Sequence, residues 1–460
     1  MSLVGYLQRP VVPGSRLVGG VYRVNADRLT DGVRRDLTLT PKSFQPQPPP
    51  PVIAYDEGDQ GNDAGVPRFY GLARFGDPES SELAEGAPLP LELAFAGALA
   101  SAQAEAHDAL VAHVRRTGGG LLVRKCGGGK TVIAIRAWLT LGVRAIVYVH
   151  KSFLLEQWIE RIRQFAPGAR VGFLQQDKVV VDDVDVCIAM IQSASSRDYD
   201  PAVFADFGLA IFDECHHMAA KTFHAVARKS RTRYVFGVTA TLERPDGLTS
   251  LILHSLGGVA HESAPEADDG SGSAETVVRV TRYEAPPGRG GDVKMRSGMI
   301  YRARMNDALC RDRERTALVA GLIEEAYLQG RHTLVLSDLI DLLNSLESKL
   351  RSTGAVPVEE LGYYIGKTKP KDRPAQAQKK VVLSTYSMAK EALDIPTLDC
   401  LVLAMPTGDA IEQCVGRIQR PCATKQTPLV HDVVDTNSYF FKAMAAKRHR
   451  FYGSRRLVLV

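Results

Sequence analysis

The chain has 460 residues, of which 57 are lysine or arginine and 52 are aspartate or glutamate, so its formal net charge is +5. Hydrophobic residues make up 45% and charged residues 24%, which excludes a disordered chain, a collagen and a disulfide-rich scaffold. No apolar run reaches the ~18–20 residues of a membrane span, and the N-terminus has no apolar stretch typical of a secretory signal. This length predicts two or three domains, and the net charge alone identifies no partner.

The cysteines give a prediction about the compartment. Seven are scattered along the chain, and none forms a Cys-x-x-Cys pair. An odd, scattered set is typical of reduced thiols inside a cell rather than of a disulfide framework. We therefore expect an intracellular protein.

Residues 1–90 differ in composition from the rest of the chain. A proline-rich stretch, Pro46 and then Pro48 to Pro51, cannot enter a helix interior or a central strand, so we expect it to be extended. Residues 56–65 are polar and glycine-bearing, as in a linker. Apolar and aromatic residues return at 66–76, for which we expect a short pair of strands. The region predicts a β-rich accessory module with a flexible linker.

From residue 91 onward, short apolar runs alternate with stretches of helical length. The runs that predict buried strands are 121–125, 145–150, 185–190, 208–214 and 234–240, followed by 333–337, 381–385, 398–405 and 428–435. Strands that alternate with helices predict an α/β fold with parallel sheets. The polar segment 261–275 separates the two groups, so the predicted domains are 1–90, 91–260, a linker or insert at 261–305, and 306–460.

One predicted helix bears on possible base-stacking residues. Residues 154–165 place their apolar side chains, including Trp158, on one helical face. Tyr148 lies in the preceding apolar run. We expect both aromatic side chains to be core residues rather than platforms for nucleic-acid bases.

Residues 125–131, with the sequence KCGGGKT, have the composition of a phosphate-binding loop between a strand and a helix. Glycines leave room for backbone N–H groups to turn towards phosphate oxygens, and the helix N-terminus adds its positive end. These glycines are Gly127, Gly128 and Gly129. Lys130 can reach the outer phosphates, and the Thr131 hydroxyl can bind Mg²⁺. Arg124 stands where the strict pattern has its first glycine, so that pattern is met only in part.

An acidic pair ends the predicted strand 208–214. Asp213 can hold Mg²⁺ through water, and Glu214 can orient and deprotonate an attacking water. The alternative is a zinc site made of Cys215, His216 and His217. Adjacent residues rarely converge on one ion, and no second Cys/His pair stands at a zinc spacing.

In their order along the chain, these motifs resemble those of superfamily 2 helicases of the DExH type. The matching segments are the Lys130 loop, Asp213 to His216, Thr239-Ala240-Thr241, residues 381–396 and the Gln-x-x-Gly-Arg-x-x-Arg run at 413–420. The resemblance covers about residues 95–435. Within the superfamily the sequence is most similar to helicases of large DNA viruses, which are related to the duplex-opening helicases of transcription and repair.

The resemblance implies two tandem RecA-like domains, with ATP and Mg²⁺ bound between them. It assigns adenine recognition to Gln103, although Ala100 and Ser101 replace the usual Arg-Pro before it, and contact with the ATP ribose to Asp394. Lys130, Glu214, Gln413, Arg417 and Arg420 would be catalytic, and Thr131 and Asp213 would hold Mg²⁺. His216, Thr239 and Thr241 would couple the ATP site to the nucleic acid. Arg417 and Arg420 stand three residues apart, so we expect them on one helical face as arginine fingers.

The same resemblance names residues that would hold a nucleic-acid strand. They are Lys151, Gln192, Ser193, Arg244, Ser384 and Thr385. Local basic density adds candidates, because residues 366–380 and 447–456 are strongly cationic and arginines gather at 302–315. Such patches give salt-sensitive, sequence-independent binding, although solvated loops have the same composition.

The function predicted from the sequence is an ATP-dependent helicase or translocase that acts on nucleic acid, DNA rather than RNA. We expect a monomer without membrane contact, working with transcription or repair machinery; a viral source would place it in the host nucleus, a cytoplasmic virus factory or the virion. One alternative is a nucleic-acid-stimulated ATPase that releases or remodels without separating strands. A second is a non-catalytic ATP-binding scaffold.

Overall fold

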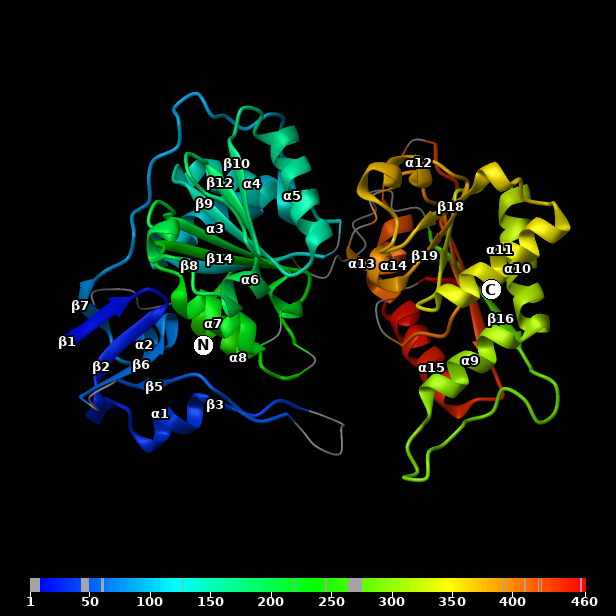
Figure 1. Cartoon of the computed structure of the whole chain (residues 1–460), viewed down its shortest axis with the longest axis horizontal. Helices are drawn as coiled ribbons and strands as arrows, with labels where there is room; N and C mark the ends of the chain where they lie inside the picture. The colour runs from blue at the N-terminus through cyan, green and yellow to red at the C-terminus, as the bar shows by residue number, and fades with distance from the viewer. Residues whose placement is uncertain are drawn as a thin grey trace. The chain divides into compact units, whose positions relative to one another are not determined.

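The computed structural model describes residues 9–42, 49–58, 62–125, 127–218, 220–244, 246–263, 275–391, 393, 395–408, 411–420, 422, 424–455 and 457–460. The chain forms two compact units, Met1–Ala267 and Asp268–Val460 (Figure 1). Each unit is an α/β structure built on a parallel sheet, and the first also carries a small N-terminal sheet. The fold is therefore that of two tandem RecA-like domains with an accessory module.

The accessory module is a five-stranded sheet at the start of the first unit. In spatial order its strands are β5 (Asp56–Glu57), β6 (Asp63–Pro67), β2 (Val21–Asn25), β1 (Val11–Val18) and β7 (Asp77–Ser81). A separate pair, β3 (Thr38–Leu39) and β4 (Val52–Ile53), and the helix α1 (Asp31–Asp36) lie nearby in sequence. The proline-rich stretch falls partly outside the described residues.

The strand pair expected at 66–76 is wrong, because most of this segment is the helix α2 (Arg68–Arg74). Arg68 explains the difference: its guanidinium is buried and donates to the carbonyl oxygens of Thr232 (3.2 Å) and Arg233 (2.9 Å). Gly71 packs directly on the Tyr22 side chain, where a Cβ would collide. The helix is thus held by contacts with residues far away in the sequence, and it joins the module to the segment that leads into β14.

The large sheet of the first unit has eight strands. In spatial order they are β11 (Lys178–Val180), β10 (Val171–Gln175), β12 (Val186–Met190), β9 (Ala145–Val149), β13 (Leu209–Asp213), β14 (Tyr234–Thr239), β8 (Gly119–Val123) and β15 (Val259–Glu262). All neighbours run parallel except β11, which is antiparallel to β10. The five strands predicted in this half are confirmed, each within two residues at either end.

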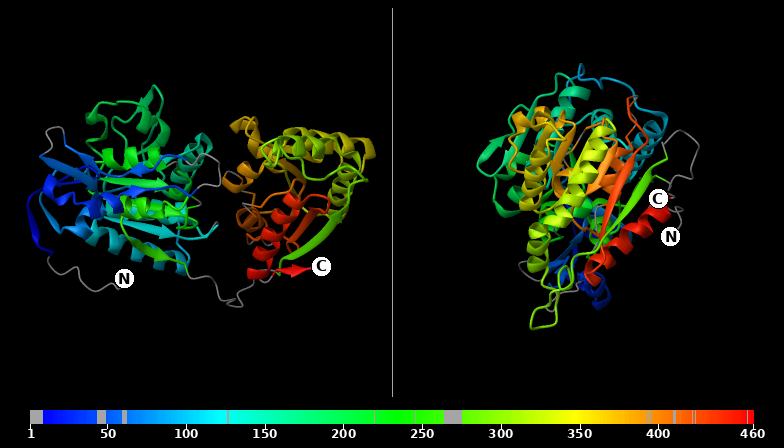
Figure 2. Two further views of the ribbon diagram at one scale, coloured as in Figure 1. Left: turned by 90° about the horizontal axis from the view of Figure 1, so that it is seen from below. Right: turned by 90° about the vertical axis from the view of Figure 1, so that its right-hand side faces the viewer.

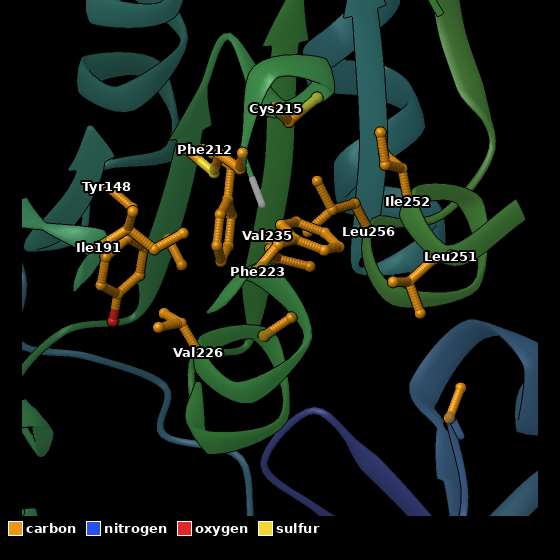
Figure 3. Close-up of a cluster of buried hydrophobic side chains, with 14 of the residues drawn as sticks. Tyr148, Ile191, Phe212, Cys215, Phe223, Val226, Val235, Leu251, Ile252 and Leu256 are labelled. Carbon is orange, nitrogen blue, oxygen red and sulfur yellow. The ribbon is translucent and has the colours of Figure 1, made fainter. Parts of the chain in front are cut away.

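Helices cover both faces of this sheet (Figures 1 and 2). One face packs against α3 (Ser101–Thr117), α4 (Lys130–Leu141) and α5 (Ser152–Phe165). The other packs against α6 (Ile191–Ser196), α7 (Ala220–Lys229), α8 (Thr249–Leu256) and the accessory module. Side chains that alternate along each strand supply both cores, and Figure 3 shows Phe212, Phe223 and Leu256 within the second.

The second unit has a seven-stranded sheet in which every recorded pairing is parallel. In spatial order the strands are β18 (Leu361–Tyr364), β19 (Val381–Ser384), β17 (Thr333–Leu336), β20 (Cys400–Leu403), β21 (Leu429–Asp435), β16 (Val277–Tyr283) and β22 (Val458–Leu459). Its helices are α9 (Arg302–Arg311), α10 (Arg313–Leu328), α11 (Ile340–Thr353), α12 (Arg373–Ala377), α13 (Tyr386–Glu391), α14 (Ile411–Ile418) and α15 (Tyr439–Ser454). The four strands predicted in this half are confirmed.

Three details of the second unit differ from the sequence expectation. The segment 261–305 contains β16, a strand of the sheet, paired along its whole length with β21. α14 ends at Ile418, before Arg420, because the residue ahead of Pro421 is disfavoured in a helix. Two arginines expected in exposed basic patches are buried: Arg315 is paired with Asp435 (2.6 Å), and Arg448 with Asp432 (2.6 Å).

No helix within the described residues is long and apolar enough to cross a membrane.

Candidate functional site

The predicted site residues of the first unit lie at one edge of its sheet. Parallel strands place their carboxyl ends together, so the segments that follow β12, β9, β13, β14 and β8 meet there in that order. The phosphate loop follows β8, Thr239 ends β14, and Asp213 ends β13. Residues more than 100 positions apart in sequence thereby become neighbours.

The phosphate loop is built on left-handed glycines. Gly127 and Gly129 have φ of +80° and +79°, a conformation that L side chains rarely adopt. A Cβ on Gly129 would collide with the Gln103 side chain, whose Oε1 accepts from the backbone N–H of Ala100 (3.1 Å). Arg124, at the position where a glycine was expected, ties the loop by donating to the carbonyl oxygen of Gly128 (3.1 Å). Gln103 thus packs against the glycine-rich loop.

Lys130 begins α4 and forms an ion pair across the edge. Its Nζ lies 3.1 Å from Oε1 of Glu214, and both side chains are largely buried. Glu214 itself has φ of +47°, so the chain turns sharply out of β13 to point this carboxylate towards α4. The first turn of α4 contains no acidic residue, so no carboxylate of this turn offsets the positive N-terminal end of the helix dipole.

A hydrogen-bond network continues from Glu214 to the end of β14. Oε2 of Glu214 accepts from the backbone N–H of Ala240 (3.3 Å). The Thr239 hydroxyl donates its single proton to the carbonyl oxygen of Thr241 (2.7 Å) and lies 2.5 Å from Nδ1 of His216. Nδ1 must therefore carry a hydrogen and donate to Thr239. Of the three residues predicted to couple the site to nucleic acid, Thr239 is thus in direct contact with both His216 and Thr241.

Asp213 is held by a residue that the sequence did not reveal. Nε1 of Trp158, on α5, donates to Oδ2 of Asp213 at 2.8 Å, and both side chains are buried. Burial raises the pKa of Asp213 to about 7, and the charge of Glu214 acts in the same direction; the Trp158 hydrogen bond and Lys130 act in the opposite direction. Trp158 and Tyr148 are core residues, as expected, but Trp158 also has this polar role.

The residues at this edge fit Mg²⁺ bound together with a nucleotide. Mg²⁺ takes oxygen ligands and typically uses one or two protein groups, with phosphates and waters completing its shell. The Asp213 carboxylate and the Thr131 hydroxyl are oxygen donors of this kind. Around Gly127, apart from its chain neighbours, no atom of the described residues lies within 4 Å of where a Cβ would stand, so the loop has open space beside its backbone.

Two of the three residues of the alternative zinc site, Cys215 and His216, have other roles in the structure. Cys215 is buried in the apolar core beside Phe212 and Leu256 (Figure 3), and burial raises the pKa of its thiol to about 12. Nδ1 of His216 is engaged by Thr239. Across the described part of the chain, no group of three or more His, Cys, Asp or Glu side chains is arranged to hold a metal ion.

The strand-binding candidates of the first unit differ in exposure. Lys151 precedes α5 and lies 5.9 Å from the Phe153 ring centroid, and exposed Gln192 donates to the carbonyl oxygen of His150 (2.8 Å). Ser193 is buried, and its hydroxyl accepts from the backbone of Gln176 (2.9 Å). The Arg244 side chain is also buried. Its guanidinium forms an ion pair with Asp246 (2.6 Å) and donates to the carbonyl oxygen of Met218 (2.8 Å).

The candidates of the second unit lie around the ends of β19 and around α14. Ser384 is buried and donates to the carbonyl oxygen of Tyr364 (2.5 Å), whereas half-buried Thr385 accepts from the backbone N–H of Met388 (3.4 Å). Nε of Arg417 donates to the carbonyl oxygen of Ala389 (2.8 Å). Arg420 and Gln413 are half-buried. Asp394 lies outside the described residues.

Oε1 of Gln413 is buried and, within the described part of the chain, has no hydrogen-bond partner. A buried acceptor left unsatisfied costs free energy, and such atoms are rare unless a ligand or water completes them. This oxygen is consistent with the role that the resemblance assigns to Gln413.

A family comparison agrees with the motifs. The family described as "Type III restriction enzyme, res subunit" matches residues 97–244, which span Gln103, the phosphate loop, Glu214 and the Thr239 segment.

Relatives of known sequence cover more of the chain. A protein of Acanthamoeba polyphaga mimivirus, named as an ATP-dependent RNA helicase, is 29% identical over 95% of this chain and 84% of its own length. An African swine fever virus protein with the same type of name is 24% identical over 72% of this chain and 67% of its own. The solved structure of T4 UvsW aligns over 97% of this chain and 98% of that chain, at 13% identity and a TM-score of 0.39, too low to support a conclusion.

Proposed function

We propose that this chain, which belongs to the superfamily 2 helicases and is an ATP-dependent nucleic-acid enzyme, couples ATP hydrolysis to strand separation of DNA. The observation that carries the proposal is the ion pair between Lys130 and Glu214 at the carboxyl edge of the first sheet. It joins a cation suited to hold outer phosphates to a carboxylate suited to orient water.

The pair suggests how nucleotide binding prepares the site. Phosphate oxygens that approach the phosphate loop compete with Glu214 for Nζ of Lys130. Once Lys130 turns to the phosphate, Oε1 of Glu214 is released and can accept a proton from water. The backbone N–H of Ala240 still holds Oε2, so the carboxylate keeps its orientation during this exchange.

Asp213 and Thr131 would hold Mg²⁺, partly through water. The ion would supply charge neutralisation on the phosphate oxygens. Trp158 keeps the Asp213 side chain in one orientation by its hydrogen bond. Gln103, packed against Gly129, would read the adenine, and Asp394 the ribose.

The second unit would complete the reaction. Arg417 and Arg420 are proposed to neutralise the charge that develops on the γ-phosphate, and Gln413 to contact the attacking water. Such arginines contribute roughly 10³–10⁵ in rate in other phosphoryl-transfer enzymes. The His216–Thr239–Thr241 contacts would report loss of the γ-phosphate to the strand-binding residues.

We propose DNA as the polymer, a monomer as the working form, and transcription or repair machinery inside a cell as the setting. The proposed boundaries are an accessory module at 1–90 and a first motor domain at 91–260, while the second motor domain comprises 306–460 together with β16 of the preceding segment. The mimivirus and African swine fever virus relatives are both named as RNA helicases, so RNA is the competing substrate.

The test is ATP turnover measured with single-stranded DNA, duplex DNA and RNA at matched salt, beside a strand-displacement assay. We expect stimulation and displacement with DNA, and loss of both in Lys130→Ala. Stimulation without displacement would favour a remodelling ATPase. Turnover of Lys130→Ala at the wild-type rate would overturn the assignment of the site.

A further inference from the structure

A hairpin in the second unit presents apolar side chains to solvent. Between β16 and α9 the chain leaves the sheet as a projecting loop, visible in Figure 1 and in the right-hand view of Figure 2. Within it, Lys294 and Ile300 form an antiparallel bridge, and the backbone N–H groups of Met295 and Tyr301 donate to Met299 and Val293 (both 2.7 Å). The tip turns at Gly298, which has φ of +81°.

The base of this hairpin is anchored. The carboxylate of Asp292 accepts from the Ser438 hydroxyl (2.6 Å) and from the backbone N–H of Phe440 (3.2 Å) at the start of α15. Val293 and Ile300 pack against a small core of their own. That core contains Met305, Leu309 and Phe441. The hairpin is therefore a fixed part of the unit.

The tip, by contrast, is exposed. Met295, Met299 and Tyr301 are 42%, 45% and 36% exposed, so three large apolar side chains fall within seven residues. Met295 and Met299 stand opposite each other across the hairpin, and Tyr301 follows two residues later. Apolar clusters on a fixed surface commonly mark a binding site.

The charge around the tip indicates the partner. No acidic residue stands between Asp292 and Asp307, while four cations do: Lys294, Arg296, Arg302 and Arg304. None of the four forms an ion pair with any residue that the structure describes. Arg304 lies 5.6 Å from the Tyr301 ring centroid, so its charge adjoins the apolar face. A polyanion with flat apolar groups matches this combination.

We infer that the hairpin 293–301 binds single-stranded nucleic acid, with unpaired bases against Met295, Met299 and Tyr301 and phosphates against the flanking cations. Duplex DNA hides the faces of its bases and presents phosphates outward, so it would meet only the cations. The inference rests on the proposed nucleic-acid function and adds a base-contacting site that none of the strand-binding candidates above includes.

The test compares two sets of variants in fluorescence-anisotropy titrations with single-stranded and duplex oligonucleotides. Met295→Ser with Met299→Ser removes the apolar face, and we expect binding of single strands to weaken about tenfold or more, with duplex binding unchanged. Tyr301→Phe keeps the ring and should retain affinity, whereas Tyr301→Ser should not. Lys294→Gln with Arg296→Gln should weaken binding of both substrates and lower the slope of its salt dependence by about one for each phosphate that the variant no longer neutralises.

Leu328→Ser is the matched control, because Leu328 is 76% exposed on α10 of the same unit and away from the hairpin in sequence. It should bind like the wild type. Equal single-strand affinity of the wild type and the Met295/Met299 variant would overturn the inference and leave the surface for a protein partner. A wild-type protein that binds no nucleic acid at all would overturn the proposed function as well, so the two failures are distinguishable.

Discussion

The indole Nε1 of Trp158 donates to Oδ2 of Asp213 at 2.8 Å, in a site where both side chains are buried. A helix that packs by its apolar face thus also fixes the carboxylate expected to meet Mg²⁺. The two residues are 55 positions apart in sequence, so the contact depends on α5 packing against β12 and β9, the latter being the neighbour of β13. Its effect on Asp213 can be isolated, because phenylalanine keeps most of the ring and removes the donor.

We expect Trp158→Phe to weaken the binding of Mg²⁺ with nucleotide. A hydrogen bond to a charged group contributes ~1.5–3 kcal/mol, so the Mg²⁺ concentration for half-maximal nucleotide binding should rise about tenfold or more. The same bond lowers the pKa of Asp213, so its loss should also move the acid limb of the ATPase profile to higher pH. Fluorescent-nucleotide titrations at several Mg²⁺ concentrations measure the first effect, and a pH–rate profile measures the second.

Trp138→Phe is the control for this variant. Trp138 is the other tryptophan of the chain, is equally buried, and donates to a backbone carbonyl oxygen, that of Val143 (3.0 Å). Its replacement should lower stability without changing the Mg²⁺ dependence. The same Mg²⁺ shift in both variants would mean that Trp158 acts only through packing.

Glu214→Gln should separate nucleotide binding from hydrolysis. The amide cannot accept a proton from water, so ATP turnover should fall by about 10²–10⁴. Lys130 loses its ion-pair partner, and phosphate then meets less competition, so ATP affinity should be kept or increased. Single-turnover hydrolysis and equilibrium nucleotide binding measure the two effects. Exposed Glu92→Gln is the control, and wild-type turnover in Glu214→Gln would contradict the assignment.

Thr239→Val should interrupt the coupling between the ATP site and the nucleic acid. Valine has nearly the same shape but leaves Nδ1–H of His216 without its hydroxyl acceptor. We expect nucleotide binding to persist while stimulation of ATPase by nucleic acid falls towards the unstimulated rate. Thr239→Ser restores the hydroxyl and should restore stimulation. Normal stimulation in the valine variant would show that the contact is only structural.

The strands and the ATP-site motifs could be predicted from the sequence because each is signalled locally. Apolar runs of strand length identify β9, β13 and β21, and parallel pairing then brings the carboxyl ends within each sheet to one edge. The Lys130–Glu214 contact could be expected from this arrangement in the first unit. Glu214 directly follows the end of β13, and Lys130 directly follows the glycines of the phosphate loop.

The features that escaped prediction depend on partners distant in sequence. α2 forms around Arg68, whose acceptors are more than 160 residues away. The hydrogen bond of Trp158 needs α5 and β13 in place, and the apolar spacing of α5 indicates only a core residue. Arg315 and Arg448 are cationic in composition, but buried carboxylates pair with them inside the second unit. Local patterns carry no signal for such long-range pairs.

His431 predicts a pH dependence of stability in the second unit. It is fully buried on β21, and within the described residues neither ring nitrogen has a hydrogen-bond partner. Burial lowers its pKa to about 4, and the nearby charge of Arg279 acts in the same direction. The pKa of a histidine in the unfolded chain is about 6.5, so the unfolded chain binds the proton first as the pH falls. His431 therefore favours unfolding progressively between about pH 6.5 and about pH 4.

Replacing His431 with leucine removes both the buried nitrogens and the titration. At about pH 7.5 we expect the melting temperature of His431→Leu to equal or exceed that of the wild type. At about pH 5 we expect this difference in melting temperature to be larger. Calorimetric melting curves at the two pH values measure the change. His431→Phe keeps a planar ring without nitrogens and should behave alike, which separates titration from packing. If both variants lose stability with acid as steeply as the wild type, the proton uptake must lie at other buried groups, such as His224 or His332, whose pKa values burial also lowers.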